Sequence, residues 1–589
     1  MQHLIKVLFS CSICLLFVCF GTLAQVSKSP NVILIITDDQ GYGDLGFTGN
    51  PHVQTPVLDA LARESVRLNQ FYVSPVCAPT RSSLMTGRYS LRTGVRDTYN
   101  GGATMATEEV TIAEMLREAG YRTGIFGKWH LGDNYPFRPS DQGFDESVIH
   151  LAGGMGQPGD FTTFFQGDRS YFDPVLWNNN ERKPYEGYCS DIFTDEAIQF
   201  IENQNEQPFF CYLSFNAPHT PLQVPDAYYE RYKDLDPSKG WEMDGAPVLT
   251  MSEKDKEDAR KVYAMVSNID DNVGRLLQSL DDLGISDNTV VIFMTDNGPQ
   301  QRRYNGGMRD LKGTVFRGGV RVPFFMKMPD APIRDMEINQ TLAHIDVLPT
   351  LAELCGARVP TDRVIDGRSF LPLISGASGD FFDTRPLFFY WTRKYPEPYS
   401  NIALQKGRYK LVGNTGFDAS SREFDLFDVT NDPFEQVNIG GNNLELAEEL
   451  KKELDGLLEE LTGSPHFLMD HHAQIGTSFE NPVFLNRNDA GGQRGIWTQD
   501  EVFGLWKVAI EPGIYTVRFR FLRPLEHAGR MTMELGGTVL QKQHDAAGKD
   551  EIVWENVRLA ASKGDLIPHF AEGGRSIFPL WVEIERREN

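Results

Sequence analysis

The chain has 589 residues, of which 41% are hydrophobic and 11% aromatic, enough for several packed domains and too apolar for a disordered protein. Acidic residues outnumber basic ones by 81 to 57, so the formal net charge is −24 at pH 7. Because nucleic-acid binding needs a basic surface, this balance excludes nucleic acid as the expected partner. An anionic ligand would need a locally positive pocket within a negative molecule.

Residues 1–24 have the pattern of a secretory signal peptide. Lys6 supplies the positive start, residues 8–20 an apolar core, and Thr22-Leu23-Ala24 a small-residue cleavage site. A membrane anchor is the alternative, but this apolar core is too short to span a bilayer. We therefore expect a cleaved signal, no membrane span and a periplasmic or secreted protein.

Two apolar segments rich in β-branched residues, 31–36 and 289–294, have the pattern of strands buried on both faces of a parallel sheet. The first leads into Asp38-Asp39 and the second into Asp296-Asn297. Open α/β sheets bind ligands at the carboxyl ends of their strands, and Ca²⁺ prefers carboxylate and amide oxygens. For either pair alone, a polar turn that closes a strand is the alternative.

The most informative stretch lies between these strands, at residues 74–88, where Cys77, Pro79 and Arg81 form a Cys-x-Pro-x-Arg sequence. We expect a turn that leads into a helix, with Cys77 just before the N-terminus, Pro79 at the first position and Gly87 at the end. Arg81 would then lie on the same face one turn later. A buried structural thiol is the alternative for a cysteine considered alone.

Four basic residues occur where strand and helix patterns alternate. Lys128 and His130 follow the short strand pattern at 122–126, and in an extended chain they would point the same way. His219 follows the strand pattern at 208–215, and Lys312 lies in the glycine-rich segment 311–323. A lone Lys-x-His is more often at the surface, and each of the four residues taken alone is weak evidence of function.

Together these residues closely resemble the type I sulfatases of the alkaline phosphatase superfamily over most of residues 30–460. The resemblance implies an α/β fold with a large mixed sheet between helices, and sulfuric ester hydrolase activity. It also implies that a maturation enzyme converts Cys77 to formylglycine. The matching positions imply a Ca²⁺ site formed by Asp38, Asp39, Asp296 and Asn297, completed by the oxygen of modified Cys77.

The resemblance also implies a mechanism, in which hydrated formylglycine attacks sulfur, the alcohol departs, and loss of the second hydroxyl proton expels sulfate. Arg81 and Lys128 would stabilise the formylglycine side and the bound anion. His130 would be the base, whereas His219 and Lys312 would lie at the leaving oxygen, His219 as proton or hydrogen-bond donor. The division of roles between the two histidines stays open.

The C-terminal third changes in character. Short strand patterns and a leucine stripe at residues 446–461 predict a small α+β subdomain over 376–465, after a catalytic domain at 30–375. Residues 466–480 have the composition of a linker, in which we expect His471 and His472 to be solvated. From residue 481 to 589 the alternation of apolar and polar residues predicts an all-β accessory module, a sandwich.

These features predict an exported sulfatase that acts on a sulfated carbohydrate, such as a fragment of an algal polysaccharide. The insertion at 153–188 is rich in Gly, Asn and aromatic residues, which could stack on sugars at a cleft rim, although core packing is the alternative. Two other functions are weighed. One is a formylglycine-dependent phosphonate or phosphate ester hydrolase, whose members tend to carry Asp-His where this chain has Asp296-Asn297. The other is an inactive, glycan-binding homologue.

Overall fold

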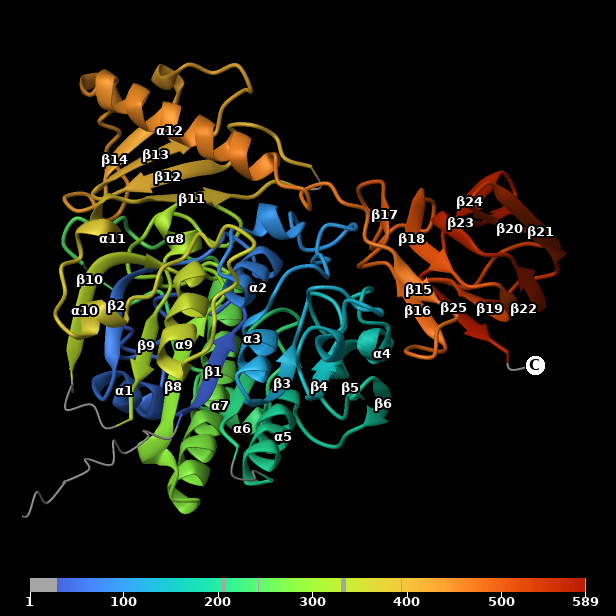
Figure 1. Ribbon diagram of the computed structural model, residues 1–589, viewed down its shortest axis with the longest axis horizontal. Helices are drawn as coiled ribbons and strands as arrows, with labels where there is room; N and C mark the ends of the chain where they lie inside the picture. The colour runs from blue at the N-terminus through green and yellow to red at the C-terminus, as the bar shows by residue number, and fades with distance from the viewer. Residues whose placement is uncertain (1–28, 204–206, 242, 330–334, 394, 588–589) are drawn as a thin grey trace, which may run out of the picture.

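A computed structural model describes residues 29–203, 207–241, 243–329, 335–393 and 395–587. It contains a large α/β region, a small sheet with one long helix, and a β-module at the C-terminal end (Figure 1). The expected signal peptide, residues 1–24, lies outside the described residues. Within these ranges, no helix combines the length and apolar character that crossing a membrane requires.

The α/β region is built on a ten-stranded mixed sheet with the order β10-β2-β9-β8-β1-β7-β3-β4-β5-β6. Its strands are β1 (Asn31–Thr37), β2 (Val66–Tyr72), β3 (Arg122–Lys128), β4 (Glu146–His150), β5 (Val175–Asn178), β6 (Glu181–Pro184), β7 (Phe209–Ser214), β8 (Thr289–Thr295), β9 (Phe324–Lys327) and β10 (Met336–Ala343). The central strand β1 runs parallel to both β7 and β8 and is buried along its whole length. The predicted fold class is therefore confirmed.

Helices cover both faces of this sheet, which explains why β1 is apolar at every position. Its residues Val32, Leu34 and Ile36 pack into one core, whereas Ile33 and Ile35 pack into the other. The first core is shared with α2 (Cys77–Thr86), α3 (Ile112–Glu118) and α9 (Val347–Cys355), and the second with α1 (Pro56–Arg63), α5 (Cys189–Glu202) and α7 (Glu253–Asp282). Shorter helices are α4 (Phe161–Phe164), α6 (Asp226–Tyr229), α8 (Arg317–Val320), α10 (Leu371–Ile374) and α11 (Asp380–Thr384).

The small subdomain is an antiparallel sheet of β11 (Pro386–Tyr390), β12 (Ile402–Lys406), β13 (Tyr409–Gly413) and β14 (Asp425–Asp428). The helix α12 (Leu444–Thr462) lies across it, at the top of Figure 1. Its leucine stripe, including Leu450, Leu454 and Leu461, is buried against the strands. The periodicity of the sequence therefore identified the packed face correctly.

The β-module consists of two sheets around one core, as expected for a sandwich. One sheet follows the order β15-β18-β23-β20-β21, with β17 and β24 at its margins, and the other the order β16-β25-β19-β22. The strands are β15 (Ala473–Ile475), β16 (Val483–Asn486), β17 (Gly491–Gly492), β18 (Gly504–Ile510), β19 (Gly513–Arg520), β20 (Gly529–Leu535), β21 (Thr538–His544), β22 (Glu551–Leu559), β23 (Ser562–Glu572), β24 (Arg575–Ile577) and β25 (Trp581–Arg586).

The structure differs from the expected linker at residues 466–480. Strand β15 lies within this range and pairs in parallel with β18, so part of the range belongs to the module. His471 is not a solvated side chain, because its ring packs edge-on against Phe137 at 5.7 Å and its Nε2 is buried. The prediction failed because it rested on the polar composition of residues 466–480, which does not show that part of this range is packed.

The aromatic residues of the insertion at 153–188 mostly pack inward rather than line a cleft rim. Phe161 is 5% exposed and stacks on Phe484 of the β-module with a centroid distance of 5.1 Å. Tyr171 is fully buried, and Trp177 lies edge-on to Phe484 at 6.0 Å. Core packing is thus the better reading of these residues. Phe165, which is 54% exposed, is the exception.

Candidate active site

Helix α2 holds Cys77 in the interior at its own first residue. The residue before it, Val76, is extended and forms the N-cap, and Gly87 ends the helix with a φ of 68°. The expected start at Pro79 was therefore wrong, since Pro79 is the third residue. A proline fits there because the N–H groups of a first helical turn have no partner within the helix.

The predicted metal ligands come together because their strands are neighbours. β1 and β8 are paired in register, with Thr37 opposite Thr295, so the residues that follow each strand meet at one edge. Asn297 Nδ2 donates to Asp39 Oδ1 at 2.8 Å. Candidate ligand atoms of Asp38, Cys77 and Asp296 lie within 4.8 Å of one another, and so do those of Asp38, Asp39 and His219.

Three oxygens of this cluster suit a hard cation such as Ca²⁺. Asp38 Oδ1, Asp39 Oδ2 and Asn297 Oδ1 are buried and have no hydrogen-bond partner among the described residues. Buried acceptors without a partner are costly and rare, and carboxylate and amide oxygens are the ligands of Ca²⁺. Burial and then the charge of Asp38 raise the pKa of Asp296 to about 7, which a bound cation would counteract. The donor set therefore fits Ca²⁺.

Each carboxylate of the cluster also contacts a lysine or an arginine. Lys128 Nζ contacts Asp38, Lys312 Nζ contacts Asp39, and Arg81 Nη2 donates to Asp296 Oδ2 at 2.9 Å. These three ion pairs cancel in charge, so a bound Ca²⁺ would leave the site with a net charge of about +2. A local positive charge of this kind would attract an anion to an otherwise negative protein.

Asp39 remains ionised within this cluster. Burial raises its pKa, but the charge of Lys312 and the hydrogen bonds from Lys312 and Asn297 outweigh that effect and hold the pKa below its usual value. The Lys312 side chain is 14% exposed, whereas those of Lys128 and Arg81 are almost fully buried. Lys312 therefore lies nearest to solvent among the three.

His130 presents an unpaired nitrogen. Its Nε2 lies 2.7 Å from the carbonyl oxygen of Thr98, and because a carbonyl only accepts, Nε2 carries the proton. Nδ1 is buried and has no hydrogen-bond partner in the part of the chain that the structure describes. Burial and then the charge of Lys128 hold the pKa of His130 well below its usual value, so the ring is neutral. A neutral ring with a bare Nδ1 can accept a proton.

The backbone at His130 is not the extended chain that the Lys-x-His spacing suggested. Strand β3 ends at Lys128, and His130 has a φ of 62°, which is unusual for a residue other than glycine. Gly153 lies directly against the ring, since a Cβ there would be 2.8 Å from His130 Cε1. The ring is therefore held between Thr98 and Gly153.

His219 has the opposite tautomer. Its Nδ1 donates to the carbonyl oxygen of Thr220 at 2.6 Å, and its Nε2 lies 3.7 Å from Asp39 Oδ2. Burial lowers its pKa to about 3, although Asp39 opposes this shift. Donation from Nε2, the role expected from the sequence, therefore requires an additional proton that a bound anion would favour.

Several supporting residues were missed from the sequence. Ser214 Oγ accepts from Arg81 Nη1 at 2.6 Å and itself donates to the carbonyl oxygen of Lys128, joining β7, α2 and β3. Arg303 pairs with Asp44 and donates from Nη2 to the carbonyl oxygen of Asp39 at 2.8 Å. The only local signal was that Ser214 ends a strand beside β3, because the other contacts join distant segments.

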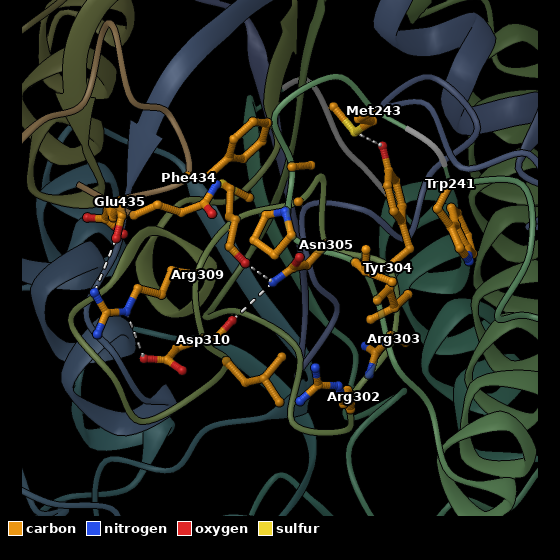
Figure 2. A pocket seen from close by; sticks show the side chains of 18 of the residues that line it. Trp241, Met243, Arg302, Arg303, Tyr304, Asn305, Arg309, Asp310, Phe434 and Glu435 are labelled. Carbon is orange, nitrogen blue, oxygen red and sulfur yellow. Dashed lines mark hydrogen bonds and ion pairs between the residues drawn. The ribbon is translucent and has the colours of Figure 1, made fainter.

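A pocket of about 680 Å³ is lined by Arg303, which donates to the Asp39 carbonyl oxygen, and by Leu311, the neighbour of Lys312 (Figure 2). Its wall contains Trp241 and Tyr304, whose rings stack at 4.2 Å. Arg309 also lines it, although that guanidinium already donates to the carbonyl oxygen of Glu435 and covers the Phe316 ring. The pocket thus offers mixed polar and aromatic surface next to the Lys312 loop.

Comparisons with known proteins agree with this geometry. The Sulfatase family model matches residues 30–357, and the model for the C-terminal region of N-sulphoglucosamine sulphohydrolase matches 309–462. N-acetylgalactosamine-6-sulfatase of Mus musculus is 32% identical over 422 residues, covering 66% of this chain and 72% of its own. Arylsulfatase A of Homo sapiens is 32% identical over 441 residues, covering 69% and 78%.

Among solved structures, Ps i-CgsB in complex with k-i-k-neocarrahexaose has a TM-score of 0.64 and 28% identity, covering 74% of this chain and 94% of its own. The family match, the relatives and the shared fold lead to one conclusion. This chain belongs to the sulfatase family and is a sulfuric ester hydrolase.

Proposed function

We propose that this enzyme is exported and hydrolyses sulfate esters of a carbohydrate by means of formylglycine formed from Cys77 and a Ca²⁺ ion. The observation that carries the proposal is the cluster itself: Cys77, Asp38 and Asp296 have candidate ligand atoms within 4.8 Å of one another, beside oxygens without partners. In such a site formylglycine supplies the nucleophile and Ca²⁺ supplies charge stabilisation.

The residues of the chain divide the remaining work. Asp38, Asp39, Asp296 and Asn297 would hold the cation, and Arg81 and Lys128, both buried, would orient the residue-77 side of the site and the bound sulfate. His130 would accept a proton at its bare Nδ1. Lys312 and His219, the two basic side chains beside Asp39, would face the leaving oxygen. His219 can donate there only after it gains a proton.

A sulfated saccharide is the substrate class with most support. The similar enzyme of Mus musculus is named as an N-acetylgalactosamine-6-sulfatase, and the similar structure Ps i-CgsB was solved with a neocarrahexaose. The pocket of about 680 Å³ beside the Lys312 loop has room for a neighbouring sugar. An algal galactan, fucan or ulvan fragment is the leading candidate over an animal glycosaminoglycan.

The test measures sulfate released from a panel of sulfated oligosaccharides and a nitrophenyl sulfate, and the phenol released from an aryl phosphodiester. We expect the highest kcat/KM on an oligosaccharide. A nitrophenyl sulfate that is preferred by orders of magnitude, with no sulfate released from any glycan, would contradict the carbohydrate assignment. Preference for the phosphodiester would favour a phosphonate or phosphate ester hydrolase, and glycan binding without turnover would favour an inactive homologue.

The second part of the test concerns Cys77. Intact-mass and peptide-mass analysis of active protein should show an aldehyde in place of the Cys77 thiol. Cys77→Ala removes the precursor of the nucleophile, so we expect loss of sulfate release with little change in Tm. A Cys77→Ala protein that keeps full activity would exclude the proposed mechanism. Cys211→Ala, at another buried free thiol, is the matched control and should stay active.

A further inference from the structure

The β-module lies beside the catalytic region (Figure 1), and one of the segments that contact this region is residues 484–492, which we name the docking segment. It starts in β16 and ends in β17, and it lies outside both ranges that match the family models. Its middle residues Asn486, Arg487 and Asn488 are at most 1% exposed. Such complete burial of three polar side chains in a row indicates a specific interface.

The docking segment is fixed firmly to its own module. The Arg487 guanidinium donates to backbone carbonyl oxygens of Pro579, Phe578, Ile496 and Gln499, at distances from 2.6 to 3.0 Å. Trp506 Nε1 donates to the carbonyl oxygen of Asn486 at 2.6 Å. A planar guanidinium with this many partners has little freedom, so the segment is a rigid surface of the module.

The same segment contacts the loop that carries His130. Asp489 Oδ2 accepts from the Asp133 backbone N–H at 3.0 Å, and Asn486 Nδ2 donates to Asp133 Oδ2 at 2.8 Å. The carbonyl oxygen of Phe484 accepts from Asn134 Nδ2 at 2.9 Å. Asp133 is 4% exposed and lies three residues after His130. The docking segment therefore binds both its backbone and its side chain.

It also contacts the two other loops that touch the His130 ring. On the Thr98 side, the Gly492 N–H donates to Asn100 Oδ1 at 2.8 Å. On the Gly153 side, Asp133 Oδ1 accepts from the Ala152 N–H at 3.2 Å, and the ring of Phe161 stacks on Phe484. All three loops around the ring are thus fixed by one segment of the module.

Backbone conformation gives a reason for this support. His130, Asn100 and Ala152 have φ values of 62°, 58° and 58°, one in each of the three loops. Residues other than glycine adopt this region at an energetic cost and keep it only where the surroundings enforce it. The docking segment contacts Asn100 itself and Asp133, three residues after His130, and it reaches the Ala152 N–H through Asp133.

We propose that Asp489 and Asn486 are positioning residues for catalysis, which hold the His130 ring in place from the β-module. The inference rests on the proposed role of His130 as the base. The module is therefore a working part of the catalytic site and not an independent glycan-binding appendage. Because the contacts reach His130 rather than the sulfate-binding side chains, their loss should lower kcat and leave KM nearly unchanged.

The test compares Asp489→Ala with Asp489→Asn, whose amide oxygen can still accept from the Asp133 N–H. We expect Asp489→Ala to lower kcat by about tenfold or more, as a small misplacement of a catalytic group does, and Asp489→Asn to restore most of the loss. Met533→Ala, which opens the buried core of the module away from the interface, is the control for general destabilisation and should keep kcat.

A double-mutant cycle with His130→Ala identifies the route of the effect. If Asp489 acts through His130, the double variant should have the same kcat as His130→Ala alone, because residues acting through one group are not additive. Asn100→Gly, which keeps the positive φ but removes the bond to Gly492, provides a second variant should Asp489→Ala fold poorly. We expect it to lower kcat in the same non-additive way.

Additive effects with His130→Ala, or full kcat in folded Asp489→Ala and Asn100→Gly, would overturn this inference alone. Wild-type protein that releases no sulfate, or His130→Ala with full kcat, would overturn the proposed function or the proposed base and the inference with it. The two kinds of failure are therefore separate.

Discussion

At the scale of single residues, the active site balances charges that would be unfavourable separately. Asp38, Asp39 and Asp296 are buried together, and each is paired with a buried or nearly buried cation. Removing one partner of such a pair leaves an uncompensated buried charge, which is strongly destabilising. The cluster is therefore a unit, and single substitutions in it should affect both activity and stability.

Asp296→Asn tests this unit with little change in shape. It removes the charge of one proposed cation ligand, which is also the charged partner of Arg81, so we expect kcat to fall by about 10²–10³-fold. We expect added Ca²⁺ to raise the Tm of the wild type by binding to the native state, and this rise should shrink or vanish in the variant. Differential scanning fluorimetry with Ca²⁺ or chelator measures it. Asp168→Asn, at an exposed carboxylate, is the control, and an equal Ca²⁺ response in both variants would contradict the assignment.

At the scale of elements, loops hold the functional groups more than helices or strands do. Helix α3 begins with a capping box, since Thr111 Oγ1 accepts from the Glu114 N–H at 3.0 Å, but it carries no candidate site residue. His130, in contrast, depends on Gly153 in the loop after β4. The close approach of Gly153 and the hydrogen bond to Thr98 together limit where the ring can lie.

Gly153→Ala should therefore displace the His130 ring. The added Cβ would lie 2.8 Å from Cε1, so the ring must move by several tenths of an ångström. We expect a fall in kcat of about 10–10²-fold, with KM and Tm changed little. Steady-state kinetics with a sulfated substrate measures this. Gly441→Ala is the control because an added Cβ there meets no atom within 4 Å. Equal kcat in both variants would mean that the ring position is not critical.

A second prediction at this scale concerns Asp160, which precedes α4 in the insertion. Burial raises its pKa from 3.8 to about 7, despite hydrogen bonds from Thr163 and Thr162. The native state therefore keeps this proton over a pH range in which the unfolded chain has lost it. Stability falls as the pH rises from about 4 to 7, since the native state binds more protons there.

Asp160→Asn should remove this dependence because the amide does not titrate. The difference in Tm, variant minus wild type, should become more positive as the pH rises from about 4 to 8, by about 2–4 °C for each kcal/mol. Thermal unfolding at a series of pH values measures it, with Asp168→Asn as the exposed carboxylate control. A difference in Tm that stays constant with pH would show that Asp160 titrates normally in the folded protein.

The sequence predicted best what local patterns encode. Buried strands 31–36 and 289–294 and the Cys-x-Pro-x-Arg stretch identified the edge of the sheet where Asp38, Cys77 and Asp296 meet. It predicted poorly what long-range packing decides. The tautomers of His130 and His219 depend on the carbonyl oxygens of Thr98 and Thr220, and the first of these contacts joins segments 32 residues apart. No periodicity or motif marks such contacts.

At the scale of the whole molecule, the β-module differs most from its sequence-based description. The alternation in β19 correctly predicted a sandwich, with Tyr515, Val517 and Phe519 inside. Polar residues such as Asn486 and Asp133, however, form the interface to the catalytic region. Polar residues at an interface cannot be told from surface residues by sequence. The sequence therefore does not distinguish a module that is only appended from one that packs against the catalytic region.

We therefore expect that removal of residues 466–589 prevents correct folding and abolishes activity, and does not merely change substrate preference. The truncated chain would expose three aromatic rings of the catalytic region. The rings of Phe161 and Trp177 now contact Phe484, and the ring of Tyr135 stacks on Phe479 at 4.7 Å. It would also leave the Asp133 N–H without its carboxylate partner. We expect poor soluble yield and no sulfate release, measured by expression, size-exclusion chromatography and a sulfate assay.

Phe484→Ala in the full chain gives the graded version of the same experiment. It removes the stacking partner of Phe161 and opens a cavity at the interface, which should cost about 3–5 kcal/mol of stability while the module stays attached. The truncation should be the more damaging of the two changes. The substitution should lower Tm, whereas the truncation should leave no folded enzyme. A truncated chain that is soluble and fully active would show instead that the catalytic region folds and works without its module, because the exposed aromatic surface would then carry no penalty.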